Sequence, residues 1–113
     1  MKVLLDENLD HALRNLLVPH QVVTVAFMGW VGLSNGELLK AAEDNGFEVL
    51  LTGDTTLHLE QNLPGRRLAV VALSAIQLPL ILKHVARIVA AIDAAVPGSF
   101  QLVDCGTFDR RRR

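Results

Sequence analysis

Two apolar segments of the sequence each end in carboxylates. "VLLDEN", residues 3–8, ends in Asp6 and Glu7, and "VLLTGD", residues 49–54, ends in Asp54. One acid after a strand is ordinary turn chemistry. Two carboxylates held about 5 Å apart repel each other by about 3 kcal/mol at an effective dielectric constant of 20. A cluster of such acids therefore needs a proton, a basic neighbour or a cation, and the two segments predict a site if the fold brings them together.

The hydrophobic pattern predicts which elements position these acids. Short apolar or β-branched segments predict strands at residues 2–5, 21–25, 47–52, 67–73 and 99–104. Amphipathic segments between them predict helices at 8–17 with Asn8 as the cap, at 34–46, near 55–62 and at 77–96, with a glycine-bearing loop at 27–33. This alternation predicts one α/β domain over residues 1–113, with three α/β/α layers around a mainly parallel five-stranded sheet.

Topology then predicts where the acids meet. The carboxyl ends of parallel strands lie along one edge of the sheet, and ligands of open α/β sheets bind at that edge. Asp6 and Asp54 follow the first and third predicted strands, and Glu37 lies in the first turn of a helix that starts at the same edge. The sequence therefore predicts a metal site of Asp6, Glu37 and Asp54, with Glu7 and Asp104 as additional candidates. Oxygen ligands without cysteine or a nearby histidine suit Mg²⁺ or Mn²⁺ better than zinc.

Each acid also has a simpler structural interpretation. Ser34 and Glu37 have the spacing of a capping box, in which the Glu37 side chain bonds back to the first residue of the helix. Asp6 and Asp54 can each cap the helix that follows. Taken singly, the acids are better explained as caps, and their shared position at one sheet edge is what favours a site.

The motifs resemble those of the short bacterial PIN-like family. "LLDEN" at residues 4–8 is similar to that family's opening, and "GLSNGELLKAAEDNGFEVLLTGD" at 32–54 is similar to its G-x-S-[DE]-x-E-[IL]-L and L-[LV]-T-x-D motifs. The resemblance covers most of residues 1–82. It implies a Mg²⁺- or Mn²⁺-dependent ribonuclease, in many cases a toxin paired with an antitoxin. By motif position it assigns metal binding and catalysis to Asp6, Glu37 and Asp54.

The sequence departs from this family at two positions. Asn35 stands where an acid is common, and Thr56 stands where the family often has a second acid after Asp54. A catalytically degenerate PIN-like binding module is therefore the first alternative. A receiver-like phosphoacceptor domain is the second, because paired acids, Asp54 and Ser74 follow the first, third and fourth strands. The lysine that a receiver requires after its fifth strand is missing from "QLVDCG", residues 101–106.

Composition bounds the remaining possibilities. The net charge of −1 gives no basic field for nucleic acid, although Arg110–Arg113 form either a solvated tail or a phosphate contact. The single Cys105 excludes an internal disulfide bond and a four-cysteine zinc site, and favours a reducing, cytoplasmic location. Acids interrupt the N-terminal apolar segment, so a signal peptide is not expected, and polar residues interrupt the apolar segment 68–82, so a membrane span is not expected.

Two further features suggest partners. The predicted helix 77–96 is apolar on more than one face, which favours a homodimer or an antitoxin contact. Trp30, in the glycine-bearing loop, is expected either to anchor in the core or to stack on an RNA base.

Overall fold

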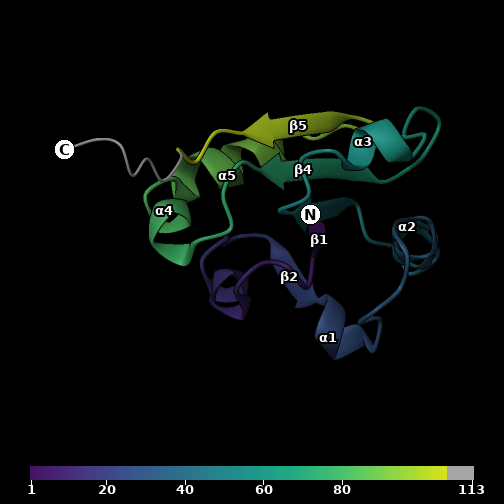
Figure 1. Cartoon of the computed structure of the whole chain (residues 1–113), viewed down its shortest axis with the longest axis horizontal. Coiled ribbons are helices and arrows are strands. Elements are labelled where there is room, and N and C mark those ends of the chain that lie inside the picture. The colour runs from purple at the N-terminus through teal and green to yellow at the C-terminus, as the bar shows by residue number, and fades with distance from the viewer. Residues whose placement is uncertain (107–113) are drawn as a thin grey trace.

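The structure, a computed structural model, describes residues 1–106, so the Arg110–Arg113 tail lies outside the described residues. Within residues 1–106 the chain forms a five-stranded sheet in which every neighbouring pair of strands is parallel (Figure 1). The strands are β1 (Lys2–Leu5), β2 (Gln21–Thr24), β3 (Val49–Thr52), β4 (Ala69–Leu73) and β5 (Phe100–Val103). Their order across the sheet is β2-β1-β3-β4-β5.

Helices cover both faces of this sheet. They are the 3-10 helix η1 (His11–Asn15) and the α-helices α1 (Val25–Met28), α2 (Asn35–Asp44), α3 (Leu57–Glu60), α4 (Leu78–Leu82) and α5 (Val85–Asp93). Alternate strand residues point to opposite faces. Val3 and Leu5 pack with η1, α4 and α5 in one apolar core, whereas Leu4 packs with α1, α2 and α3 in the other. The predicted three-layer α/β fold is therefore confirmed.

The capping box predicted for the second helix forms as expected. The Ser34 hydroxyl oxygen accepts a hydrogen bond from the Glu37 N–H at 3.3 Å, and the Glu37 carboxylate accepts one from the Ser34 N–H at 3.1 Å. Leu38 and Leu39 then turn inward, and Gly46, with a φ of +79°, ends the helix in the left-handed conformation that glycine adopts most easily.

Two elements predicted in the N-terminal half of the chain differ from those in the structure. The first helix is the short η1, and its cap is Asp10, whose carboxylate accepts the Ala12 N–H, rather than Asn8. The helix α1 replaces the last residue of the predicted strand 21–25 and the first two residues of the predicted loop 27–33. It forms because the Thr24 hydroxyl oxygen accepts the Phe27 N–H and caps a helical turn directly after β2.

The prediction of one long helix over residues 77–96 was wrong. The chain forms α4 and α5, separated at Lys83 and His84, whose N–H groups donate to carbonyl oxygens three residues back. This tightened turn ends α4, and α5 restarts from the His84 carbonyl oxygen. Ile81 and Ile88 nevertheless both reach the core.

The strand order puts the topological switch point of the sheet between the C-terminal ends of β1 and β3, and we refer to this place as the crevice. The connection after β1 runs over the η1 face, whereas the connections after β2 and β3 run over the opposite face. Where the connections from two neighbouring strands run to opposite faces of the sheet, a crevice opens between the strand ends, and α/β proteins bind ligands there. In the strand order 2-1-3-4-5 this point lies between β1 and β3. Leu5 pairs with Leu51 at this end of the two strands.

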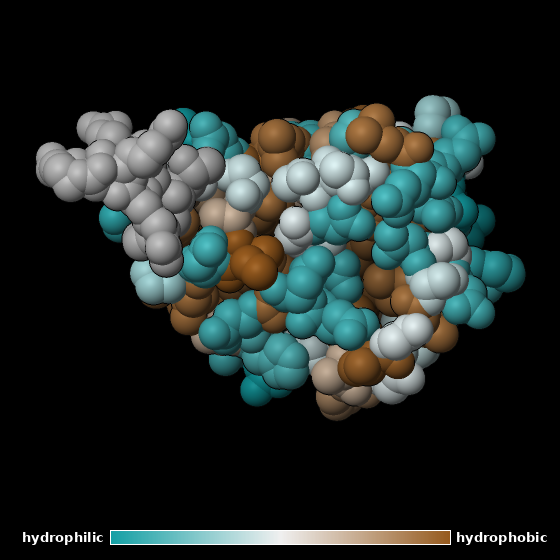
Figure 2. All heavy atoms as spheres, viewed as in Figure 1, coloured by the Kyte–Doolittle hydropathy of each residue, from teal (hydrophilic) through white to brown (hydrophobic). Residues whose placement is uncertain are grey.

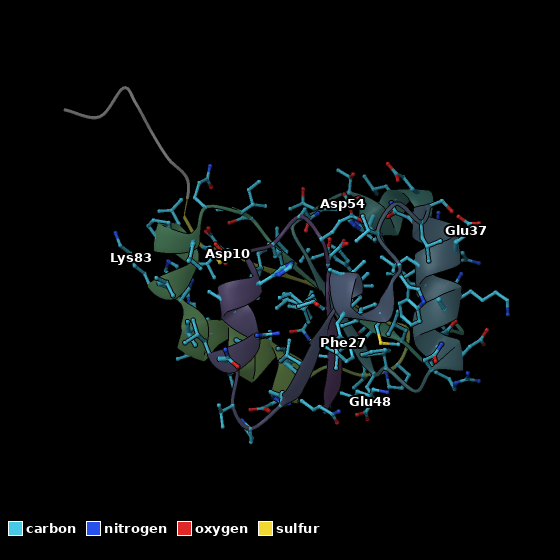
Figure 3. The ribbon with its side chains drawn as sticks, turned by 90° about the horizontal axis from the view of Figure 1, so that it is seen from below. Asp10, Phe27, Glu37, Glu48, Asp54 and Lys83 are labelled. Carbon is cyan, nitrogen blue, oxygen red and sulfur yellow. The ribbon has the colours of Figure 1, made fainter. Side chains whose placement is uncertain are left out.

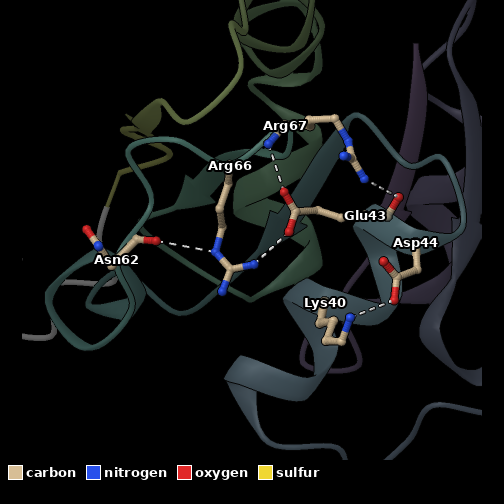
Figure 4. A network of polar contacts seen from close by, with 6 residues as sticks. All are labelled: Lys40, Glu43, Asp44, Asn62, Arg66 and Arg67. Carbon is tan, nitrogen blue, oxygen red and sulfur yellow. Dashed lines mark hydrogen bonds and ion pairs between the residues drawn. The ribbon is translucent and has the colours of Figure 1, made fainter.

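The other end of the molecule carries a charged cluster (Figure 4). The Glu43 carboxylate accepts hydrogen bonds from the Arg66 guanidinium and from the Arg67 N–H, each at 2.7 Å. Arg66 is thus paired with Glu43, and its side chain is only 25% exposed. Burial alone would raise the pKa of Glu43, but the hydrogen bonds from Arg67 and Arg66 and the Arg66 charge outweigh it and lower that pKa.

We expect Glu43→Gln to lower the free energy of unfolding at pH 7 by roughly 1 kcal/mol, because it removes the charge from two hydrogen bonds that water partly screens. Since the folded-state pKa of Glu43 is lowered, its contribution is present above the unfolded-state pKa and is lost as the pH falls through the folded-state pKa. Urea unfolding of the wild type and of Glu43→Gln, at pH 7 and at pH 3, measures the difference in their free energies of unfolding at each pH.

The matched control is Asp44→Asn. Asp44 pairs with Lys40 on the same helix at 3.1 Å, but both side chains are more than half exposed (Figure 4). Such a pair contributes at most about 0.5 kcal/mol. Equal losses in the two variants would contradict the proposed difference.

Candidate functional site

Asp6 is the most buried carboxylate at the C-terminal edge of the sheet. It directly follows β1, and its N–H donates to the Leu51 carbonyl oxygen, which extends the pairing of β1 with β3 by one residue. Its side chain is only 7% exposed. One carboxylate oxygen accepts the Glu7 N–H at 2.8 Å, and the other accepts the Thr52 hydroxyl at 2.7 Å.

Thr52 links the ends of β1 and β3. It is the last residue of β3 and is fully buried. Its hydroxyl group donates to Asp6, and the same oxygen accepts the Asp54 N–H at 3.0 Å. The side chain that holds one carboxylate therefore also fixes the backbone of the second.

Asn8 clamps the turn that follows. Its amide oxygen accepts the Gly53 N–H at 3.0 Å, which explains why Asn8 does not cap η1. A Cβ at position 53 would meet the Ile76 side chain, so any larger residue there requires Ile76 to move. The turns after β1 and β3 are thus locked together by contacts that reach across 45 residues of sequence.

Asp54 lies at the same crevice with its carboxylate partly engaged. One oxygen accepts both the N–H and the hydroxyl of Thr56, at 2.9 and 3.0 Å. The other accepts a long contact of 3.4 Å from the Asn35 amide at the start of α2. Thr56, which stands where the PIN-like family often has an acid, therefore donates to Asp54 instead.

The electrostatics of the pair are unfavourable for Asp6. Burial is the largest influence and raises the pKa of Asp6. The hydrogen bonds from Thr52 and from the Glu7 N–H lower that pKa, while the negative charges of Glu7 and Asp54 raise it further. The net effect raises the pKa of Asp6, which means that the folded protein holds this charge at a cost.

The other predicted acids accept hydrogen bonds of their own, and Figure 3 labels Glu37 among them. Glu37 is exposed on α2, where its carboxylate caps the helix through Ser34, and this hydrogen bonding lowers its pKa. The Glu7 carboxylate accepts the Gly32 N–H at 3.1 Å. Asp104 follows β5, at the far side of the sheet, and accepts the Gly106 N–H. The structure thus brings Asp6 and Asp54 together and leaves Glu37 and Asp104 outside the pair.

The donor set can be compared with the needs of the predicted metal. Among residues 1–106 no group of three histidine, cysteine, aspartate or glutamate side chains is arranged to hold a metal ion. The three-acid site of Asp6, Glu37 and Asp54 therefore stays a prediction. Mg²⁺ is commonly held by one or two carboxylates, with waters and substrate phosphates as its other ligands. The two carboxylates of Asp6 and Asp54 are the type and number of protein ligands that such a Mg²⁺ site uses.

Sequence reasoning missed three polar residues of this site. Thr52, Asn8 and Asn35 connect the two carboxylates to each other and to their turns. The signal for Thr52 and Asn8 was present, since each lies two residues from one of the acids in a motif already noted. Asn35 was considered only as a missing acid.

Compared with known proteins, the chain matches no family model, no curated protein and no solved structure. Membership of the PIN-like family therefore stays a prediction that rests on the sequence motifs. In the part of the chain that the structure describes, no helix has the length and apolar character needed to cross a membrane.

We expect Asp6→Asn to stabilise the protein at pH 7, because it removes a buried charge that two neighbouring carboxylates repel. The sign follows from the raised pKa: the charged Asp6 destabilises the folded state, so the gain is fully present at pH values above the folded-state pKa, shrinks as the pH falls through that pKa, and is gone below the lower, unfolded-state pKa. Urea unfolding of both proteins across this range measures the difference. A variant less stable than the wild type at pH 7 would contradict the assignment.

We expect Thr52→Val to raise the pKa of Asp6 further, because it removes the hydroxyl donor without changing side-chain size greatly. Thr52→Ser keeps the donor and should restore the wild-type titration. Carbon-13 NMR titration of the Asp6 carboxyl resonance distinguishes the three proteins. An Asp6 pKa that is the same in Thr52→Val and the wild type would show that the hydroxyl does not tune this carboxylate.

Proposed function

We propose that this protein is a PIN-like, Mg²⁺- or Mn²⁺-dependent ribonuclease that hydrolyses RNA phosphodiester bonds with Asp6 and Asp54. The observation that supports this most is the linkage of the two carboxylates through Thr52, in the crevice between β1 and β3. Carboxylates are rarely buried unless they are paired or bind a cation. Asp6 is buried beside two acids, so a bound cation would relieve its unfavourable environment.

The residues of the crevice have distinct tasks in this proposal. Asp6 is held rigidly by its two hydrogen bonds and presents its remaining lone pairs to the crevice. Asp54 presents the oxygen that only the long Asn35 contact engages. A divalent cation bound by these oxygens would activate water and neutralise charge that develops on the phosphate. In this proposal Glu37 can bind the cation only if its carboxylate gives up the hydrogen bond that it accepts from the Ser34 N–H.

One observation favours a second candidate, the catalytically degenerate binding module. Thr56 occupies the position of a common family acid, and both its N–H and its hydroxyl donate to Asp54. These donors compensate part of the Asp54 charge without a metal. The receiver-like alternative is weaker, because the Ser74 hydroxyl oxygen accepts the Cys105 N–H and is thereby turned toward the end of β5.

The partners and setting belong to the same proposal. A toxin of this kind would act on cytoplasmic RNA, would be paired with an antitoxin and would form a homodimer. Exposed apolar side chains that such partners would cover lie on several elements, including Leu59 on α3 and Leu82 on α4. The continuous apolar helix on which the homodimer was predicted is replaced by two shorter helices that bury Ile81, Ile88 and Ile92.

We expect the purified protein to cleave an RNA panel in Mg²⁺ or Mn²⁺, and Asp6→Asn or Asp54→Asn to reduce the rate by at least roughly a hundredfold, the range over which loss of one electrostatic contact acts on a transition state. Gel analysis of end-labelled RNA measures the rate. Asp104→Asn, an acid at the same sheet edge but outside the pair, is the matched control and should retain activity.

Three outcomes separate the candidates. Metal binding by calorimetry without cleavage of any RNA would favour the degenerate binding module. Stable labelling of Asp54 by acetyl phosphate would favour the receiver-like domain. Equal loss of activity in Asp104→Asn would show that the Asp6–Asp54 pair is not the reactive centre.

A further inference from the structure

A groove lies at the open edge of β2, the strand next to β1. Its volume is about 180 Å³, and it is lined by Arg14 of η1, Val22, Val23 and Thr24 of β2, and Phe27 of α1. We call it the β2 groove. Thr24 pairs with Leu5 across the sheet, and Asp6 is the next residue along the chain. Because neighbouring strands lie about 5 Å apart, the Thr24 end of the β2 groove lies close to the crevice that holds Asp6.

One wall of the β2 groove is an aromatic side chain that the core does not use. Phe27 is 80% exposed, although burying a phenylalanine side chain would stabilise the protein by about 2 kcal/mol. The other aromatic groups of residues 1–106 are engaged: Trp30 packs edge-on against Phe47 in the core, and Phe100 stacks with His58. Of the two roles expected for Trp30, the structure shows packing against the core, with the residue partly buried, and Phe27 presents the free ring.

The opposite wall carries a cation with no carboxylate partner among the described residues. The ion pairs within residues 1–106 use His20, Lys40 and Arg66, so Arg14 stands outside them. Arg14 is an exposed residue and lines the groove together with Val22 and Val23, which give the groove its apolar floor. Figure 2 shows apolar atoms exposed at the lower rim of the molecule, over α1, and Figure 3 places Phe27 beside β2.

We propose that the β2 groove binds one or two nucleotides of single-stranded RNA that lead into the crevice, with Phe27 stacking on a base and Arg14 contacting a phosphate. An exposed ring and a cation on opposite sides of a narrow apolar groove suit a chain of alternating flat bases and phosphates. A duplex does not suit it, because its bases are already stacked on one another. This inference rests on the proposed function, since it takes RNA as the substrate.

Fluorescence anisotropy with a fluorescein-labelled 12-nucleotide oligo(U) tests the proposal. The full chain is used in EDTA, so that binding is measured without metal or cleavage. We expect Phe27→Ala to weaken binding roughly five- to 150-fold, the effect of losing one stacked base, and Phe27→Trp to restore it. Arg14→Gln should make the slope of log affinity against log salt shallower by about 0.7, the value for one phosphate contact in a single strand. A labelled RNA hairpin should bind more weakly than oligo(U).

Two matched controls separate stacking from general surface effects. Leu102→Ala truncates an apolar side chain that is 55% exposed on β5, the opposite edge of the sheet. Lys83→Gln removes an exposed cation that does not line the β2 groove and that lies at one end of the molecule, away from Phe27 (Figure 3). Both should bind oligo(U) as the wild type does. Circular dichroism confirms that each variant is folded.

Several results would overturn the proposal. They are no oligo(U) binding by the wild type, the same affinity in Phe27→Ala and the wild type, and equal losses in Phe27→Ala and Leu102→Ala. A change of oligomeric state in Phe27→Ala with unchanged oligo(U) binding would instead assign the β2 groove to a protein contact. If the protein cleaves RNA but neither binding nor cleavage depends on Phe27, the RNA-binding role of the β2 groove is wrong and the proposed ribonuclease function is unaffected. If oligo(U) binding depends on Phe27 but no RNA is cleaved, the β2 groove proposal stands and the ribonuclease proposal is contradicted.

Discussion

The hydrogen bond from the buried Thr52 hydroxyl group to the Asp6 carboxylate is the contact on which the C-terminal edge of this sheet depends. It joins the ends of β1 and β3 at 2.7 Å, and the same oxygen accepts the Asp54 N–H. Without that donor Asp6 would be a buried charge with one backbone partner, beside two other acids. A buried charge that loses a partner costs several kcal/mol. One hydroxyl group therefore lets a carboxylate stay at the bottom of the crevice.

The architecture and the capping box could be predicted from the sequence because both depend on local chemistry. Apolar segments such as "VLLT" at 49–52 are too short for helices and too continuous for a half-exposed strand, which leaves a buried parallel strand. The spacing of Ser34 and Glu37 likewise has one efficient hydrogen-bonding solution. In both cases the determining contacts are close in sequence.

The features that could not be predicted depend on contacts between distant segments. Asn8 and Asp10 are equally good caps by residue type, and only the Gly53 N–H, far along the chain, decides that Asn8 is used elsewhere. The break between α4 and α5 is invisible for another reason. Ile81 and Ile88 lie two helical turns apart, so the apolar pattern continues through the break without a glycine or proline to mark it.

The balance between local and distant contacts also explains the predicted site. The sequence predicts Asp6, Asp54 and Glu37 at one sheet edge, but only Asp6 and Asp54 come together there. Strand topology correctly brought the first two to one edge. The start of α2 also faces that edge, but a carboxylate that satisfies the free N–H groups of its own helix has no reason to leave them. Capping and metal binding compete for the same lone pairs, and in this structure the Glu37 carboxylate makes the capping hydrogen bond. Asp6 differs from Glu37, because its one local hydrogen bond comes from the Glu7 N–H and the other comes from Thr52, 46 residues away. The cost of the Asp6 charge is carried by the fold, which is the condition under which a cation bound at this crevice would gain the most.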